Sequence, residues 1–318
     1  MNDARDAAAS SMRSATEAQE PACPLVSVGM PIYNSARYLR TALDSLQNQT
    51  LTDFELIISD NASADDTQAI CEEYMRRDAR IRYIRQARNI GAPRNWNVLV
   101  HEARGEFFKW ASGNDYCAPT MLERCVGAMR DEPSVVLCYG RTQLIDESAK
   151  PIGLYEGDIA VPDIRASDRF DRVRRELSMN NAQQGVIRTA MLRQTGLDRP
   201  YPNGDVELMA ELALHGRFVL LPDVLLYRRQ SPGTITAMRS PADLQRIYNP
   251  EARRPMKLVL TRFHWDHLVG IARAPVPLRE KFRAWGHAVR YVRWDRSKLW
   301  REMCSLVRPE TTTRAHGT

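Results

Sequence analysis

The 318-residue chain lacks the long apolar run that a membrane-spanning helix needs, since no stretch approaches about 18 consecutive apolar residues. It has no CxxC pair among its six irregularly spaced cysteines, which argues against a zinc site and against a disulfide framework. Neither GxGxxG after the first apolar segment nor GxxxxGK[ST] occurs, so the two commonest nucleotide-binding fingerprints are absent. Residues 1–23 have no apolar centre, and we expect a disordered tail there, not a signal peptide.

What the chain does contain is typical of a globular protein in a reducing cytoplasm, with 43% hydrophobic and 26% charged residues. Its net charge of +6 is unevenly placed, because residues 251–318 hold 15 Lys and Arg against 6 Asp and Glu. The rest of the chain is therefore slightly acidic, which argues against a general nucleic-acid-binding role. A local basic face would suit anionic lipid or a phosphate-bearing partner.

Short apolar runs alternate with helical patterns through the first half of the chain. Strands are predicted at 25–31, 54–60, 80–86 and 106–111, each followed by a helical pattern or a polar loop. A helix at 119–133 and a strand at 134–140 follow. Strands that alternate with helices predict an α/β fold with a mostly parallel central sheet and flanking helices.

The second half is less regular. Residues 146–180 are charged and predicted to be loop-like, 180–196 indicate a strand and then a helix, and 203–216 indicate a helix. An apolar strand begins at 218 and is predicted to be interrupted by Pro222. We therefore divide the chain into parts at 24–120, 121–240 and a helical extension at 241–318.

Four polar stretches follow predicted strands: PIYN (31–34), SDNASADDT (59–67), RNIGAPRNWN (88–97) and SGND (112–115). Any one of them alone is most simply a turn. In a parallel sheet all four would gather along one edge, where open α/β sheets bind ligands. Cys117 lies close to the last of them, and we interpret it as a small buried apolar residue, not as a nucleophile, because no His stands near it in the sequence.

These stretches, together with VSVGMPIYNSARYLRTALDSLQNQ and the later YPNGDVELMAELALHGRF and LLYRRQ, resemble family 2 glycosyltransferases of GT-A fold. The resemblance covers about residues 24–236 and is most specific in the first hundred. It implies an inverting enzyme that moves a sugar from a nucleotide diphosphate, with a UDP- or dTDP-sugar as the expected donor. The implied acceptor is a hydroxyl of a cell-envelope or polysaccharide glycan, in free or lipid-linked form.

The resemblance also implies roles for individual residues. The residues that would border the nucleotide or its diphosphate are Pro31, Tyr33, Asn34, Asp60, Asn89, Gly91, Arg94 and Asn95. Asp60 would accept a hydrogen bond from the base, although a turn or cap aspartate is its simpler interpretation. Arg94 is equally well explained as a solvated helix arginine, and Asp65 and Asp66 are expected to be helix caps.

Asp205 is the candidate general base, because the family places a carboxylate in the first turn of this helix below the acceptor. Glu207 is the second candidate. A carboxylate at a helix start is also what the helix dipole alone favours, so capping is the alternative for Asp205.

The metal motif is where this chain departs from the family, whose members carry acidic DxD or DD residues at this loop. Here only Asp115 is acidic, next to the neutral Asn114. Three hypotheses follow: Asn114 and Asp115 hold Mg²⁺ or Mn²⁺ weakly, Arg228 and Arg229 replace the metal, or transfer activity has been lost. We favour the first, although Gln230 stands where relatives often have a His.

Beyond residue 250, apolar and basic residues alternate at helical spacing and predict one or two basic amphipathic helices. Trp285, Trp294 and Trp300 among arginines suit an anionic membrane surface, and docking on the protein's own catalytic domain is the equal alternative. The expected location is the cytoplasm, including the inner face of the cell membrane. HWDH at 264–267 is interpreted as a packed or surface helix and not as a zinc site.

Overall fold

The structure, a computed structural model, describes residues 23–231, 240–251 and 256–307. Nine strands form one sheet, in the order β3-β2-β1-β4-β8-β6-β9-β5 with β7 paired to β6. The strands are β1 (Val26–Ile32), β2 (Phe54–Asp60), β3 (Ile81–Arg85), β4 (Phe107–Trp110), β5 (Tyr116–Cys117), β6 (Val135–Ile145), β7 (Pro151–Leu154), β8 (Val186–Arg188) and β9 (Arg217–Arg229). The α/β architecture predicted from the sequence is confirmed.

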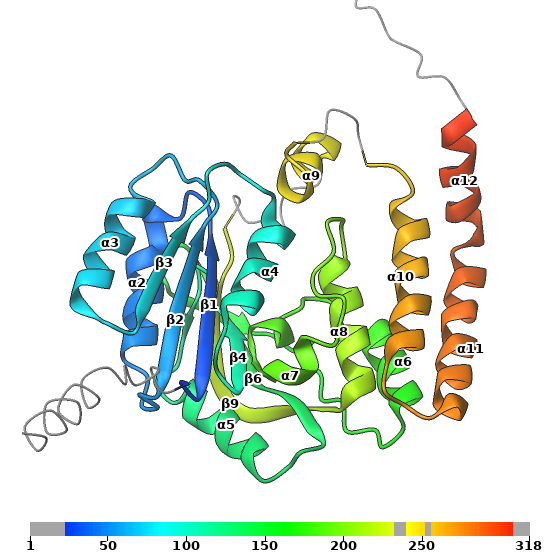
Figure 1. The fold of residues 1–318 in the computed structure, drawn as a ribbon, viewed down its shortest axis with the longest axis horizontal. Coiled ribbons are helices and arrows are strands. Elements are labelled where there is room, and N and C mark those ends of the chain that lie inside the picture. Colours follow the sequence, from blue (N-terminus) through cyan, green and yellow to red (C-terminus); the bar gives the residue numbers. More distant parts are fainter. Residues whose placement is uncertain (1–22, 232–239, 252–255, 308–318) are drawn as a thin grey trace, which may run out of the picture.

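The first part of the sheet is parallel: β1 pairs in parallel with both β2 and β4, and β2 with β3. The connections are the helices α2 (Ala36–Gln47), α3 (Thr67–Arg77) and α4 (Ala92–Glu102). The sheet then becomes mixed, because β8 runs antiparallel to β4 and β6, while β6 and β9 are parallel to each other. Figure 1 shows α2 and α3 together on one side of the parallel strands and α4 on the other.

Successive side chains of the buried strands point to opposite faces of the sheet, and they contribute to two hydrophobic cores, one on each face. Leu56 and Ile58 belong to the core under α2, α3 and α5 (Met121–Arg130), whereas Ile57 between them points into the other core. A strand buried on both faces reads as a continuous apolar run, which is why its pattern in the sequence lacks a polar face.

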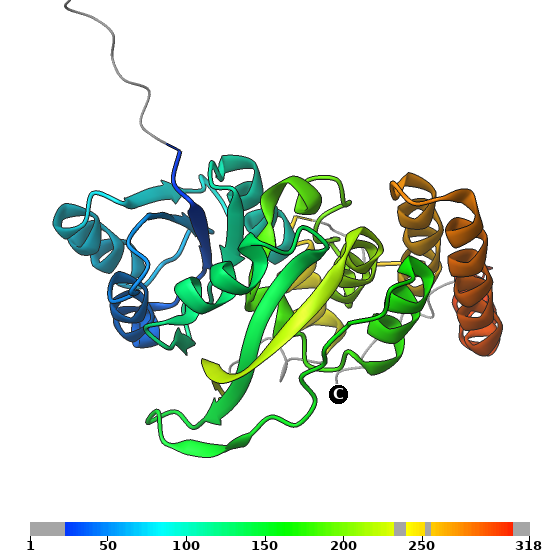
Figure 2. The same ribbon diagram turned by 90° about the horizontal axis from the view of Figure 1, so that it is seen from below.

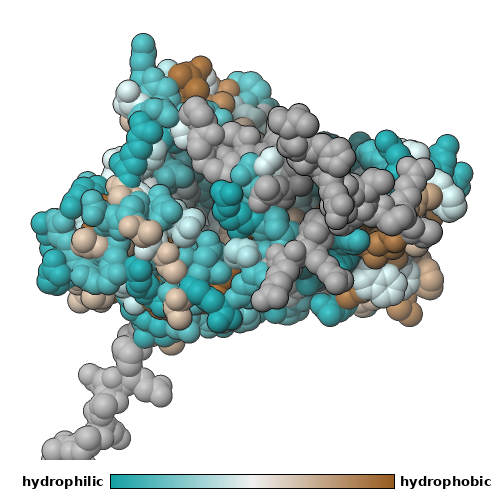
Figure 3. All heavy atoms as spheres, turned by 90° about the horizontal axis from the view of Figure 1, so that it is seen from above, coloured by the Kyte–Doolittle hydropathy of each residue, from teal (hydrophilic) through white to brown (hydrophobic). Residues whose placement is uncertain are grey.

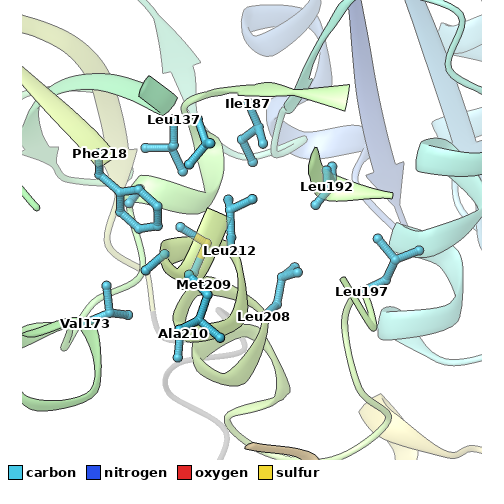
Figure 4. Packing of buried hydrophobic residues seen from close by; sticks show 14 of the residues in the cluster. Leu137, Val173, Ile187, Leu192, Leu197, Leu208, Met209, Ala210, Leu212 and Phe218 are labelled. Atoms are coloured by element: carbon cyan, nitrogen blue, oxygen red, sulfur yellow. The ribbon is translucent and has the colours of Figure 1, made fainter. Parts of the chain in front are cut away.

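The helix α8 (Gly204–His215) is the centre of the second core. Its side chains from Leu208 to Leu214 are buried all around the helix, and such a helix must be enclosed by other elements. Figure 4 shows Leu208, Met209 and Leu212 among side chains of β6, β8 and β9. This packing holds the amino-terminal turn of α8, and Asp205 with it, in a defined position.

One sequence-based prediction in the second half is wrong. The charged stretch 146–180 is not a loop throughout, because it contains β7 and the helix α6 (Ala166–Glu176). Arg169 on α6 is buried and donates to the carbonyl oxygens of Ala213 and Leu214, so charged residues there serve packing. The predicted interruption at Pro222 is present as a register shift opposite Gly140 and Arg141, and β9 continues past it, as proline at a bulge permits.

Other predictions for this half are confirmed: the strand and helix within 180–196 are β8 and α7 (Thr189–Leu192), preceded by the 3₁₀ turn η1 (Ala182–Gln184). The four remaining helices are α9 (Pro241–Tyr248), α10 (Val259–Arg273), α11 (Leu278–Trp294) and α12 (Arg296–Val307). Figures 1 and 2 show α10, α11 and α12 beside α6 and α8 at the end of the molecule away from the parallel strands, and Figure 1 shows α9 apart from them, above α4. Within the described residues, no helix has both the length and the apolar content needed to cross a bilayer.

Candidate functional site

One cavity of about 460 Å³ lies where the loops after β1, β2, β3 and β4 meet. Its walls include Tyr33 and Asn34 after β1, Asn61 after β2, Asn89 after β3 and Asn114 after β4. The four polar stretches singled out in the sequence therefore do gather at one edge of the sheet. A volume of this size suits a small-molecule ligand.

The loop after β1 is held in place by the loop after β2. The backbone N–H of Asn34 donates to Ser63 Oγ at 2.9 Å, and Asn34 Oδ1 accepts from the backbone N–H of Ala64 at 2.9 Å. Asn34 has a φ of 48°, a left-handed conformation that Asn adopts more readily than most residues. Pro31 and Tyr33 also line the cavity, and Tyr33 is 47% exposed, so its ring is available to a ligand.

Asp60 is fully buried and is not among the residues that line the cavity, contrary to what its predicted contact with a base suggests. One of its oxygens accepts from the backbone N–H (2.9 Å) and the hydroxyl (2.5 Å) of Ser63. The other accepts from the Tyr83 hydroxyl (2.7 Å) and the Arg85 guanidinium (3.0 Å). Burial and then the bond to Asp60 raise the pKa of Tyr83. Contact between Asp60 and a ligand would require one of these partners to move.

Amide side chains knit the neighbouring loops together. Asn61 Nδ2 donates to Asn89 Oδ1 at 2.9 Å, and Asn89 Oδ1 also accepts from the N–H of Gly91. Asn95 is buried, accepts from the Ser59 hydroxyl at 2.6 Å and donates to the Ser59 carbonyl at 2.9 Å. These bonds fix the cavity wall, and the same side chains present polar atoms to its interior.

Gly91 and Arg94 bring α9 onto the cavity. Gly91 has a φ of 87°, and a Cβ added there would lie 2.9 Å from the carbonyl oxygen of Tyr248. Arg94 is half-exposed and lies 3.5 Å from a carboxylate oxygen of Glu251, which Arg88 also contacts. Neither Gly91 nor Arg94 lines the cavity. Both residues instead lie against the segment at 248–251.

In the loop after β4, Asn114 lines the cavity and Asp115 does not. Asp115 is 8% exposed and both its oxygens are engaged. One accepts from Gln184 Nε2 at 3.0 Å and the other from the backbone N–H of Arg229 at 2.9 Å. Among the described residues there is no group of three or more His, Cys, Asp and Glu that could hold a metal ion. This arrangement gives no support to a metal held by Asn114 and Asp115 together.

Arg229 is buried directly behind the cavity wall. Its Nε donates to the Asn114 carbonyl at 3.1 Å, and its Nη1 donates to the carbonyls of Asp146 (2.8 Å) and Glu147 (2.7 Å). Asn114 and Glu147 both line the cavity. Arg228, its neighbour, points elsewhere and donates to Asn181 Oδ1 at 2.5 Å. Of the two arginines singled out in the sequence, only Arg229 touches the residues of the cavity wall.

Asp205 lies in the first turn of α8, partly exposed, and accepts from Asn180 Nδ2 at 3.1 Å. Burial and then the charge of Asp205 raise the pKa of Asp198 well above its usual range. Burial and then the charges of Asp205 and Asp198 raise the pKa of Tyr248, which stands on α9. The charge of Asp205 in the first turn of α8 thus acts on Asp198 and on Tyr248 of α9, whose neighbour Ile247 lines the cavity.

The carboxylate of Glu207, the second candidate base, has different partners from that of Asp205. Glu207 is buried and lies 3.3 Å from the Arg199 guanidinium, which also faces Glu211 and Asp266. These groups join α8 to α10, so Glu207 belongs to the packing of the two helices and is not placed to meet an acceptor.

Several residues of the cavity were not predicted from the sequence. Arg37 and Tyr38 of α2, Glu147 of the turn before β7, and Arg246 of α9 line it. Arg37 is 66% exposed and lies 2.9 Å from Glu147. The helical spacing of α2 marked Tyr38 as a core position and gave no signal for a ligand. Arg246 lies beyond the part of the chain that resembles the family.

Cys117 and the two histidines of HWDH have structural roles. Cys117 is buried, and burial raises the pKa of its thiol. His267 is buried, its Nδ1 lies 2.7 Å from the Phe263 carbonyl, and burial lowers its pKa to about 3. His264 pairs with Asp295 at 3.2 Å. Both histidines of HWDH therefore pack α10 against its surroundings.

Comparison with known proteins gives the fold and family. Solved structures of S. aureus TarS residues 1–349, in complexes with UDP and with UDP-GlcNAc, superpose with a TM-score of 0.59 in each case, at 20% and 19% identity. The superposition with the UDP complex covers 86% of this chain and 73% of that one. At this identity the likeness shows the fold, which is GT-A-like as predicted.

Curated relatives are also named as glycosyltransferases or as a polysaccharide synthase, and the part of this chain that each one matches differs. Glycosyltransferase GlyG of Streptococcus pneumoniae is 26% identical over 230 residues, which are 69% of this chain and 75% of GlyG. Chondroitin synthase of Escherichia coli is 33% identical over 129 residues, 41% of this chain and 19% of the synthase. The Bacillus subtilis protein EpsH, named as a glycosyltransferase, is 38% identical over 116 residues, 36% of this chain and a third (33%) of EpsH.

The match to a family model decides the assignment. The model described as glycosyl transferase family 2 matches residues 27–193, more than half of the chain, and includes the loops after β1, β2, β3 and β4. This chain belongs to glycosyl transferase family 2.

Proposed function

We propose that this protein is an inverting glycosyltransferase, which moves a sugar from a nucleotide diphosphate to an acceptor hydroxyl. The observation that carries the proposal is the convergence of four polar loops on one cavity in a family 2 chain. TarS was solved with UDP and UDP-GlcNAc, which favours a UDP-sugar as donor, with a dTDP-sugar as the second choice.

The cavity offers the groups that such a donor needs. Tyr33 and Trp96 supply aromatic surface for a base, and the amides of Asn61 and Asn89 supply donors and acceptors. Arg37 and Arg246 also line the cavity, and guanidinium groups match the oxygens of a diphosphate. Asp60 lies behind this wall and reaches the base only if Arg85 or Tyr83 releases it.

Charge on the leaving diphosphate must be balanced, and family 2 enzymes generally use a divalent metal for this purpose. The residues of the loop after β4 do not fit that role well, because Asp115 is engaged and Asn114 is neutral. Arg229 supplies a positive charge behind the same wall, close to Asn114. We assign the electrostatic role to the arginines.

Transfer would occur in one displacement. The acceptor oxygen forms a bond to the anomeric carbon while the bond from that carbon to the diphosphate oxygen breaks. The electron pair leaves with the nucleoside diphosphate, and the acceptor proton passes to the Asp205 carboxylate. Burial and then the charge of Asp205 raise the pKa of Asp198, which favours the protonated form of Asp198.

The acceptor is proposed to be a growing glycan of the cell envelope or of a secreted polysaccharide, in free or lipid-linked form. The likeness to chondroitin synthase supports a glycan acceptor, whose hydroxyl would meet Asp205 at the first turn of α8. The sugar transferred and the linkage formed depend on loop contacts that differ between relatives.

Two conservative variants test the role of Asp205. Asp205→Asn should lower transfer by about 10²- to 10⁴-fold without changing UDP affinity, because it removes the base and keeps the shape. Asp198→Asn mimics the protonated partner and should keep activity within about threefold. Equal losses in both variants, or full activity of Asp205→Asn, would remove Asp205 from the mechanism.

A catalytically silent nucleotide-binding protein of the same fold is the second candidate. The feature of the sequence behind it is SGND, which stands where the resemblance to the family implies an acidic motif. Such a protein would bind UDP but would neither transfer nor hydrolyse any UDP- or dTDP-sugar, with or without Mn²⁺ or a chelator. Release of nucleotide diphosphate by the wild-type protein that Asp205→Asn abolishes would exclude it.

A further inference from the structure

Helices α11 and α12 carry an apolar surface that the rest of the described chain does not cover. The exposed fractions are 69% for Leu278, 66% for Phe282, 52% for Val289, 71% for Trp300 and 49% for Met303, which together we call the apolar stripe. Their spacing of four, seven, eleven and three residues keeps them on one side of a helical rod. Figure 1 shows α11 and α12 running end to end, and only Asp295 separates their ranges.

The opposite side of the same helices is docked on the catalytic domain. Glu280 Oε2 accepts from the backbone N–H (3.1 Å) and the hydroxyl (2.8 Å) of Ser167 on α6. The Tyr291 hydroxyl donates to the Asp171 carboxylate at 2.6 Å. Docking therefore uses one face of the helices and leaves the apolar stripe facing outward, so the two alternatives drawn from the sequence are compatible.

The charged residues of these helices are also divided between the docked face and the exposed face. The three acidic residues between 278 and 307 are all engaged by the protein: Glu280 as above, Asp295 by His264 and Lys298, and Glu302 by the N–H groups of Leu260 and Thr261. Seven further exposed residues of these helices are basic and flank the apolar stripe: Arg279, Arg283, Arg290, Arg293, Arg296, Lys298 and Arg301.

Four of these basic residues, Arg279, Arg293, Arg296 and Arg301, have no carboxylate within ion-pair distance in the part of the chain that the structure describes. Figure 3 shows brown and white spheres beside teal ones at the right-hand end of the molecule, where α10, α11 and α12 lie. The surface thus combines uncovered apolar side chains with uncompensated positive charge.

We propose that this face of α11 and α12 binds the surface of an anionic lipid bilayer. Aromatic and aliphatic side chains of an amphipathic helix enter the boundary between headgroups and acyl chains, and arginines beside them meet lipid phosphates. Trp294, 61% exposed and beside Arg290, suits the same boundary, where an indole ring finds both apolar and polar surroundings.

A second copy of the chain is the poorer occupant. Two such faces in contact would bring their uncompensated arginines together, and like charges oppose association. An anionic bilayer instead satisfies both features of the surface at once. The inference does not rest on the proposed transfer reaction, because lipid binding can be measured without a donor or an acceptor.

The experiment is co-sedimentation of the full chain with vesicles of phosphatidylcholine, with and without phosphatidylglycerol, at low and high salt. The protein should bind only the anionic vesicles, and high salt should weaken the binding. The triple variant Arg279→Glu, Arg293→Glu, Arg301→Glu should weaken binding by about tenfold or more. The control is the triple variant Arg76→Glu, Arg77→Glu, Arg130→Glu, which makes the same change in charge on α3 and α5. It should bind anionic vesicles much more tightly than the triple variant of α11 and α12.

A second pair of variants tests the apolar part. Phe282→Ser with Trp300→Ser should weaken binding, whereas Ile152→Ser with Met75→Ser, exposed elsewhere, should not. All four variants should keep the far-ultraviolet circular dichroism of the wild type. The proposal is overturned if wild-type protein ignores anionic vesicles, or if neither variant of the helices changes binding. It is also overturned if sedimentation velocity shows a dimer that Phe282→Ser with Trp300→Ser dissociates.

Discussion

The guanidinium carbon of Arg229 lies 4.2 Å from the centre of the Tyr38 ring, and both residues belong to the wall of the cavity: Tyr38 lines it, and Arg229 lies behind. This buried cation faces an aromatic ring and donates to three carbonyl oxygens, and its guanidinium forms no ion pair with a carboxylate in the described part of the chain. The Asp115 carboxylate accepts from the backbone N–H of Arg229 and offsets part of this charge, and the remainder favours an anionic ligand in the cavity.

We expect Arg229→Met to destabilise the protein by about 2 to 4 kcal/mol, because three carbonyl groups lose their donor. Arg228→Met, next to it, loses one bond to Asn181 and should cost less than about 1.5 kcal/mol. Urea denaturation measures both values. Equal effects in the two variants would show that the carbonyl contacts of Arg229 carry no special weight.

Arg246 should contact the diphosphate and not the base. Arg246→Ala is expected to weaken UDP binding by about tenfold, as loss of a charge-assisted bond to phosphate would, and to leave uridine binding unchanged. Isothermal titration of both ligands separates the two effects. A parallel loss for uridine would indicate that α9 has shifted, and would contradict a direct contact with phosphate.

Restoring a carboxylate at the loop after β4 should create a better metal site. Asn114→Asp is predicted to tighten Mn²⁺ binding by about tenfold or more, since a charged oxygen replaces a neutral one. Mn²⁺ titration followed by electron paramagnetic resonance gives the affinity, with Asn114→Ala as the control. Unchanged affinity would argue that a cation does not bind beside residue 114.

Gly91 should be required for the position of α9. Gly91→Ala places a Cβ 2.9 Å from the Tyr248 carbonyl at a φ of 87°, so we expect a loss of about 1 to 3 kcal/mol and weaker UDP binding. Gly127→Ala is the matched control, because it lies inside α5 with nothing within 4 Å and should stabilise by about 0.5 to 1 kcal/mol. Thermal melts with and without UDP measure both effects, and a neutral Gly91→Ala would contradict the close approach of α9.

Stability should fall as pH rises through the range in which Glu207 loses its proton. Burial and then the charge of Glu211 raise the pKa of Glu207 above its usual value of about 4.3. The folded state therefore binds this proton more tightly than the unfolded state, and its stabilising effect is present at low pH and lost between about pH 4 and the raised pKa.

Glu207→Gln removes that proton equilibrium and should flatten the decline in the free energy of unfolding between about pH 5 and 8. Denaturant titrations at several pH values, with the exposed Glu123→Gln as control, measure the slope. An unchanged slope in Glu207→Gln would contradict the prediction.

Much of the fold was predictable because local rules and tertiary packing agree in the first half of the chain. The runs that became β1, β2, β3 and β4 are apolar and bounded by polar turns, and the helices between them have one apolar face. The stretch 146–180 was predicted wrongly because α6 buries charged residues such as Arg169 and Asp171, whose partners come from α8 and α11. Such long-range pairs leave no periodic signal in the sequence.

The sequence predicted which loops form the candidate site, but not which of their side chains face the cavity. Asn34, Asn89 and Asn114 each follow a predicted strand, and all three line the cavity. Position after a strand could not show that Asp60 and Asp115 turn inward, since that depends on Arg85 and Gln184. Arg37 and Arg246 were missed because nothing in their local pattern distinguishes them from solvated helix residues.

The central claim is that the cavity between these loops binds a nucleotide diphosphate sugar, and a crystal structure of the protein with UDP and Mn²⁺ tests it most directly. We predict the uracil ring beside Tyr33, Asn61 and Asn89, and the diphosphate beside Asn114 and Arg246. UDP bound on another surface, or a cavity that stays empty at saturating UDP, would contradict the account.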